Sequence, residues 1–118
     1  MQTAELLHTF NRDTALDRVG GDDELLREVA QLYLAEYPEL MRQLEGAVQA
    51  QDALSLQRSA HTLKGSLATL GAEAAARQAL ELEIMGRNGD LRGASATLSR
   101  LLDALNCFHS ELGRLTQS

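Results

Sequence analysis

Apolar residues recur three or four positions apart along most of the chain, which is the spacing of one buried face on an α-helix. Glycines and a single proline divide this pattern into segments. The first long segment follows Gly20-Gly21, where Asp22 and Asp23 supply capping side chains. Pro38 lies inside the segment, so we expect a kink or a break there. The apolar positions of this segment are Leu25, Leu26, Val29, Leu32, Leu40, Leu44 and Val48.

Three further helices are expected downstream of this segment. Asp52 can cap a helix that runs to about Leu70 and ends at Gly71. Another helix should fill residues Glu73 to about Arg87. Asp90 can cap a last long helix. The apolar positions of that helix are Leu91, Leu98, Leu101, Leu102, Leu105, Phe108, Leu112 and Leu115.

These segments predict an all-α fold. Four amphipathic helices joined by short loops pack most simply as an antiparallel up-and-down four-helix bundle. A short extra N-terminal helix is expected around Asp13 to Val19. A chain of 118 residues can hold one compact core but not two, so a single domain should span residues 1–118. Because the four helical faces can bury one another, we expect a monomer.

Composition and charge narrow the choice of partner. The chain is 44% hydrophobic but only 3% aromatic, and it is rich in helix-forming Leu, Ala, Glu, Gln and Arg. Its net charge of -6 disfavours binding to nucleic acid or to an anionic membrane surface. We therefore expect the partner to be a protein.

The single cysteine, Cys107, excludes an intramolecular disulfide and a cysteine-based zinc site. This suits the reducing cytoplasm. The first ten residues lack the features of a signal peptide, and no apolar run approaches the roughly 20 residues that cross a bilayer. We expect a cytoplasmic domain, and a membrane anchor elsewhere in a longer parent protein is compatible with this expectation.

The predicted helix after Asp52 carries the candidate chemistry on its polar side. At about 100° per residue, His61 projects far from the apolar stripe of this helix and should face solvent. Arg58, Lys64 and Gly65 lie on the same side. No acidic residue occurs from 53 to 72, so the two cations form a local positive patch that can neutralise a phosphoryl group. The apolar stripe consists of Leu56, Ala60, Leu63, Leu67 and Leu70.

Gly65 is unusual in a helix interior, where glycine is about 0.5 to 1 kcal/mol less favourable than alanine. One explanation is access, because a missing side chain lets another protein or a phosphoryl group approach His61. The alternative is a glycine needed for helix packing. His61 itself has the alternative of being an ordinary surface side chain, which the combination with Lys64 and Gly65 disfavours.

The string AHTLKGSLATLGA, residues 60–72, resembles the phosphorylation motif of histidine phosphotransfer (HPt) domains, in which the histidine is followed by Leu-Lys-Gly-Ser and then Leu-Gly-Ala. The segment GGDDELL at 20–26 resembles the residues with which the family's first long helix begins. Asp52 and Arg58 keep their usual places before the histidine. Further similarity lies in Leu82-Glu83 with Arg87, Gly89 and Asp90, so the resemblance covers roughly residues 10–112.

This resemblance implies roles for individual residues. His61 would be the phosphoacceptor through its Nε2 atom, Lys64 the phosphoryl-stabilising cation, and Gly65 the opening for the partner. Arg58 would give electrostatic support. Glu83 falls at the edge of the stripe formed by Ala75, Ala79, Leu82 and Gly86, where a polar residue approaches the histidine in several members. An ordinary solvated glutamate remains the alternative for Glu83.

The chain departs from the family pattern at two points. Leu67 stands where many members have a second small residue, so packing or docking around it should differ slightly. The segment ALELE, residues 79–83, lacks the additional histidine often seen in the phosphotransfer domains of chemotaxis kinases. The resemblance therefore favours the phosphorelay branch of the family.

The function that the resemblance implies is phosphoryl transfer between two proteins. His61 would accept a phosphoryl group from the aspartate of one response-regulator receiver domain and pass it to another receiver. The Mg²⁺ ion would come from the receiver, and the chain would need no cofactor of its own. Without a glycine-rich phosphate loop we expect no ATP site and no independent enzyme activity. A hybrid sensor kinase in the same polypeptide is a further expected setting.

Two other functions stay open at this point. One is a docking module that binds a receiver or kinase without being phosphorylated. The other is a metal-dependent bundle enzyme, because Glu5 and His8 have the Glu-x-x-His spacing of di-iron proteins. That motif occurs once, since neither His61 nor His109 has a glutamate three residues before it. His8 and His109 are expected at the surface or at its boundary with the core.

Overall fold

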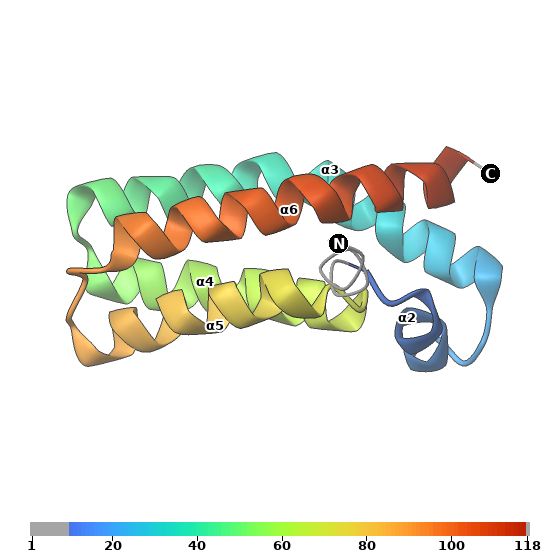
Figure 1. Ribbon diagram of the computed structural model, residues 1–118, viewed down its shortest axis with the longest axis horizontal. Coiled ribbons are helices and arrows are strands. Elements are labelled where there is room, and N and C mark those ends of the chain that lie inside the picture. The colour runs from blue at the N-terminus through green and yellow to red at the C-terminus, as the bar shows by residue number, and fades with distance from the viewer. Residues whose placement is uncertain (1–9, 118) are drawn as a thin grey trace, which may run out of the picture.

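The computed structural model describes residues 10–117 of the chain. In chain order the helices are α2 (Arg12–Arg18), α3 (Asp23–Ala50), α4 (Ala53–Thr69), α5 (Glu73–Asn88) and α6 (Ala94–Gln117). The last four run lengthwise in alternating directions, and the short α2 lies at the end of the bundle where α3 begins (Figure 1). The predicted all-α up-and-down bundle with a short preceding helix is therefore confirmed.

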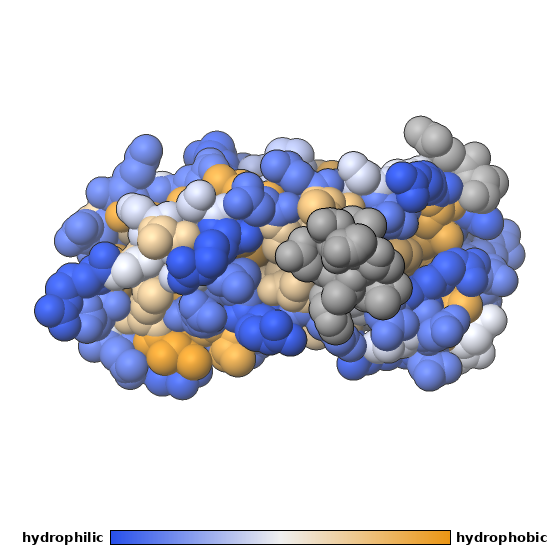
Figure 2. Space-filling model, in the orientation of Figure 1, coloured by the Kyte–Doolittle hydropathy of each residue, from blue (hydrophilic) through white to orange (hydrophobic). Residues whose placement is uncertain are grey.

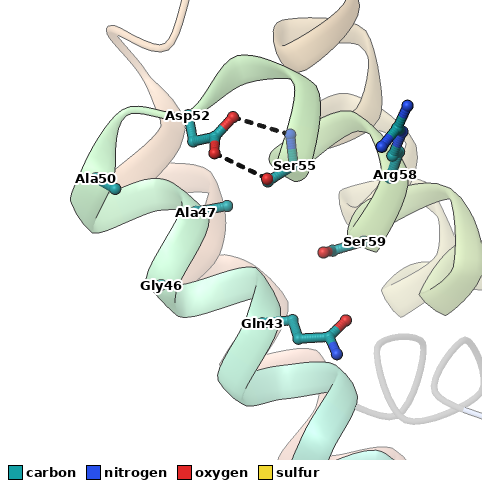
Figure 3. Close-up of a pocket in the computed structure, with 8 residues that line it drawn as sticks. All are labelled: Gln43, Gly46, Ala47, Ala50, Asp52, Ser55, Arg58 and Ser59. Carbon is teal, nitrogen blue, oxygen red and sulfur yellow. Dashed lines mark hydrogen bonds between the residues drawn. The ribbon is translucent and has the colours of Figure 1, made fainter.

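Aspartate and asparagine side chains cap the N-termini of three helices, α2, α3 and α4. Asn11 accepts a hydrogen bond from the Thr14 backbone N–H, and Asp22 accepts from the N–H groups of residues 24 and 25. Asp52 accepts from the backbone N–H of Ser55 at 3.1 Å and from its hydroxyl at 2.8 Å (Figure 3). These bonds satisfy N–H groups that the first turn of a helix leaves without an internal acceptor.

Asp90 does not cap the last helix, which corrects the sequence-based prediction. Its carboxylate accepts from the backbone N–H and the guanidinium of Arg92, and α6 begins only at Ala94. Asp90 thus stabilises the turn between α5 and α6. Both oxygens of the Asp90 carboxylate accept hydrogen bonds from Arg92, two residues away.

At Pro38, where the sequence predicts a kink or a break, α3 continues as one helix without a break. Pro38 lacks the N–H that would bond to the carbonyl of residue 34. Pro38 is exposed, so water can donate a hydrogen bond to the carbonyl of residue 34 instead. Figure 1 does show the first part of α3 inclined toward α2 relative to the rest of the helix, so a change of direction without a break accompanies the proline.

The core lies along the axis enclosed by α3, α4, α5 and α6. Two leucines of the predicted apolar pattern, Leu25 and Leu32, stay outside it and are 41% and 59% exposed. Their neighbours Leu26 and Tyr33 face inward instead, because one helix cannot turn adjacent positions to the same side. The largest fully buried side chains are Leu26, Leu44, Leu56, Leu63, Leu67, Leu70, Leu82, Leu101, Leu105, Phe108 and Leu112.

At two glycines, another segment of the backbone lies so close that a side chain would not fit. Gly71 has a φ of +75°, ends the α4 region as predicted, and accepts a 2.9 Å bond from the Asn11 N–H that fastens the start of α2. At Gly86 an added Cβ would lie 2.6 Å from the Gln57 nitrogen and 2.7 Å from the Ala53 oxygen. The backbones of α4 and α5 therefore touch at Gly86, one turn from residue 83.

Within residues 10–117, none of the helices is both long enough and apolar enough to cross a lipid bilayer.

Gly86→Ala should destabilise the protein, because the methyl group would force α4 and α5 apart. We expect the free energy of unfolding to fall by about 1 to 3 kcal/mol, as in other overpacked interfaces. The control is Gly46→Ala on α3, where an added Cβ meets nothing within 4 Å. That variant should gain about 0.5 kcal/mol. Urea denaturation measures both, and equal effects of the two substitutions would contradict the close approach.

Candidate functional site

His61 lies on the outer side of α4, and 66% of its side chain is exposed. The apolar stripe on the opposite side of the same helix is buried, with Leu56, Ala60, Leu63 and Leu67 at 0% exposure. The outward orientation expected from the helical projection is therefore observed. The imidazole is open to a partner while its helix is held by the core.

Glu83 on α5 determines which imidazole nitrogen faces outward. Its Oε2 lies 3.0 Å from His61 Nδ1, and its side chain is only 7% exposed. An ionised carboxylate accepts hydrogen bonds and cannot donate them, so Nδ1 carries the hydrogen of this contact. In the neutral ring Nε2 then holds the lone pair. The alternative of a solvated Glu83 is excluded by this burial and contact.

Two cations share the Glu83 carboxylate with His61. Lys64 Nζ lies 2.8 Å from Oε1, and an Arg87 Nη nitrogen lies 3.5 Å from Oε2. The hydrogen bond from Lys64 lowers the pKa of Glu83 from its ordinary value, and the bond from His61 adds to this, while burial acts in the opposite direction. Glu83 is consequently held as a carboxylate at neutral pH.

Gly65 lies one turn after His61, and an added Cβ there would meet nothing within 4 Å. Packing inside the domain therefore gives no reason for a glycine at this position. The bare turn leaves open space beside the imidazole, as the access explanation requires.

Arg58 is exposed and lines a hollow together with His61 and Glu83. Figure 3 shows its side chain extending away from α3, whereas the Ser59 hydroxyl points into the space between α3 and α4. Among the described residues Arg58 has no ion pair within 4 Å, unlike Lys64 and Arg87. Arg58 therefore contributes charge near the imidazole without a contact to Glu83.

Apolar side chains flank the site on both sides of α4. The hollow between α3 and α4 includes Leu32, Tyr33 and Gly65 next to His61. On the other side, Leu80 and Ile84 of α5 are 37% and 38% exposed. Figure 2 shows apolar atoms gathered along the lower edge of the molecule, over α5. A protein partner can thus bury apolar surface while it reaches the imidazole.

The sequence alone left three features of the site without a role. Arg87 was part of the family resemblance only, although its position four residues after Glu83 on a helix is a signal for an ion pair. Gly86 was placed on the packed stripe, but its backbone contact with α4 depends on the tertiary structure. Tyr33 beside the site had no signal beyond its aromatic ring.

His109 is half-buried at the boundary of the core, as expected. The Tyr33 hydroxyl and His109 Nε2 share a 2.7 Å hydrogen bond, and Tyr37 packs edge-on against the His109 ring. Burial lowers the pKa of His109, which favours the neutral ring. His109 therefore helps to join α6 to α3.

The residues proposed for a di-iron site, Glu5 and His8, lie outside the described part of the chain. Within residues 10–117, no three His, Cys, Asp or Glu side chains gather in a way that would hold a metal ion. In the described part of the chain, the acidic group in contact with His61 is Glu83, whose oxygens face Lys64, Arg87 and the imidazole. This donor set suits a charge network better than a metal centre.

Comparison with known proteins gives the same family as the motif. The Hpt domain family matches residues 28–111, which is more than half of the chain. A solved structure of the HPT domain from an Hpt sensor hybrid histidine kinase of Shewanella superposes with a TM-score of 0.84 at 22% sequence identity, over 94% of this chain and 96% of the other. No curated protein matches the sequence. The chain thus belongs to the Hpt domain family, the histidine phosphotransfer modules of phosphorelay signalling.

Proposed function

We propose that His61 accepts a phosphoryl group from the aspartyl phosphate of a receiver domain and passes it to the aspartate of another receiver. The observation that carries this proposal is the hydrogen bond between His61 Nδ1 and the buried Glu83 carboxylate. It leaves Nε2 as the nucleophilic atom of a ring that is 66% exposed. A docking module without phosphorylation would have no use for such an arrangement.

The transfer forms one bond and breaks one bond. The Nε2 lone pair attacks phosphorus, an N–P bond forms, and the bond from phosphorus to the aspartate oxygen breaks with its electrons going to the carboxylate. Nδ1 keeps its proton, so the ring gains positive charge, which Glu83 at 3.0 Å stabilises. Transfer to the next receiver reverses these steps.

The remaining residues act by positioning and charge. Lys64 can neutralise the phosphoryl oxygens, Arg58 adds positive potential, and Gly65 leaves room for the receiver. A Mg²⁺ ion bound by the receiver's own carboxylates would stabilise the phosphoryl group during transfer. A receiver in the same polypeptide, as in a hybrid kinase, and a receiver on a separate regulator would both present the required aspartyl phosphate to this cytoplasmic domain.

His61→Gln should abolish phosphorylation without unfolding the protein, because the exposed ring contributes little to the core. Wild-type protein incubated with a phosphorylated receiver should gain acid-labile, base-stable phosphate, and the variant should gain none. His109→Gln is the matched control and should still be labelled. A folded wild-type protein that binds the receiver and takes no phosphate would identify a docking module instead.

Gly65→Ala should have opposite effects on stability and on transfer. The new methyl group meets open space inside the domain, so the free energy of unfolding should rise by about 0.5 kcal/mol. Transfer from a receiver should slow by about tenfold, because the methyl group displaces the reacting atoms. Gly46→Ala should give the same gain in stability with unchanged transfer. Unaltered transfer in Gly65→Ala would show that this turn does not face the receiver.

Glu83→Gln should lower stability at neutral pH by about 1.5 kcal/mol, the usual size for a hydrogen bond to a charged group. The pKa of Glu83 is lower in the folded than in the unfolded chain, where it is near its ordinary value of 4.5. The carboxylate therefore stabilises the fold fully above that value, and the contribution is lost as the pH falls through the folded pKa.

Denaturation of wild type and Glu83→Gln at a series of pH values tests this expectation. The difference between them should shrink below about pH 4.5. Other carboxyl groups titrate equally in both proteins and cancel in the difference. A difference that does not change with pH would show that charge on Glu83 is not what stabilises the cluster.

A further inference from the structure

The buried Glu83 carboxylate faces three side-chain donors. Oε1 faces Lys64 at 2.8 Å, whereas Oε2 faces both His61 at 3.0 Å and Arg87 at 3.5 Å. The Arg87 contact is the longest of the three, and 54% of the Arg87 side chain is exposed. Arg87 is therefore only loosely engaged while Lys64 is in place.

The charge of this cluster changes when His61 carries a phosphoryl group. In the state that attacks phosphorus, in which the imidazole is neutral, one carboxylate and two cations leave an excess of one positive charge. A phosphoryl group brings about two negative charges, and the ring that keeps its Nδ1 proton gains one positive charge. The phosphorylated cluster is then neutral with Arg87 and carries an excess negative charge without it.

Lys64 cannot bind the Glu83 carboxylate and the phosphoryl group on His61 equally well at the same time. It lies three residues after His61 on the same helix, and its ammonium is a single charge on a flexible stem. Moving toward the phosphoryl oxygens lengthens its 2.8 Å contact with Glu83, whose side chain is only 7% exposed. A buried carboxylate that loses its counter-ion is strongly destabilised.

Arg87 is placed to take over this contact. It lies one helical turn after Glu83 on α5, and its guanidinium has five N–H donors, enough to bind both carboxylate oxygens. Resting on the proposed phosphotransfer at His61, we propose that Arg87 is a positioning residue that becomes the main counter-ion of Glu83 after phosphorylation, so that Lys64 is free to bind the phosphoryl group.

The experiment measures the equilibrium constant for transfer between His61 and a receiver domain charged with acetyl phosphate. Arg87→Gln should shift the equilibrium away from phosphorylated His61 by about fivefold, the upper range for a partly exposed charge pair. Arg87→Lys keeps the positive charge, so its equilibrium constant should lie close to that of the wild-type protein. Arg42→Gln, which removes an exposed arginine paired with Glu39 on α3, should leave the equilibrium unchanged. Thermal unfolding midpoints of the variants should be similar.

A second pair of variants separates this role from direct contact with the phosphoryl group. In a Glu83→Gln background no carboxylate needs a counter-ion, so Arg87→Gln should change the equilibrium less than twofold. An undiminished fivefold effect in that background would overturn the inference, because Arg87 would then act on the phosphoryl group or on the receiver. The absence of any effect in the wild-type background would overturn it as well.

The same experiment distinguishes failure of this inference from failure of the proposed function. If His61 in the wild-type protein takes no phosphate from the receiver, the proposed phosphotransfer function is wrong, and the proposed role of Arg87 is wrong as well. If His61 is phosphorylated but the two substitutions act independently, phosphotransfer stands and only the counter-ion exchange is wrong.

Discussion

The contact between His61 and the buried carboxylate of Glu83 is the interaction on which the proposed chemistry of this domain depends. One oxygen of Glu83 holds Nδ1 at 3.0 Å, and this leaves the opposite nitrogen of an exposed ring free. The same carboxylate orders Lys64 and attracts Arg87. A single acidic side chain thus sets the orientation of the ring, its hydrogen position and the local charge.

The bundle makes this contact possible through the close packing of α4 and α5. At Gly86 the two backbones approach so closely that a Cβ would not fit, and Glu83 lies one turn away on the same helix. Leu82 anchors this part of α5 in the core. The carboxylate therefore reaches the imidazole from a rigid element, which keeps the nitrogen that we propose to react in a defined position.

Charge and shape around the site suit the acidic receiver that we propose as the partner. The chain has a net charge of -6, yet Arg58, Lys64 and Arg87 surround the imidazole. Such a local reversal steers an acidic pocket toward the site, while the rest of the surface repels other anions. The open turn at Gly65 and the exposed side chain of Leu32 give that partner space and apolar contact.

The sequence by itself determined the helices, the bundle and the outward direction of His61, because apolar spacing and capping residues act over a few neighbouring positions. It misplaced the start of α6 at Asp90, whose carboxylate binds Arg92 instead. It left open whether Pro38 would bend α3 or break it, and the helix runs through the proline unbroken. Only the tertiary structure decided that Glu83 is buried against His61 and that Gly86 lets α4 and α5 touch. Those contacts join residues more than twenty positions apart, and local spacing does not specify which sides of two helices meet.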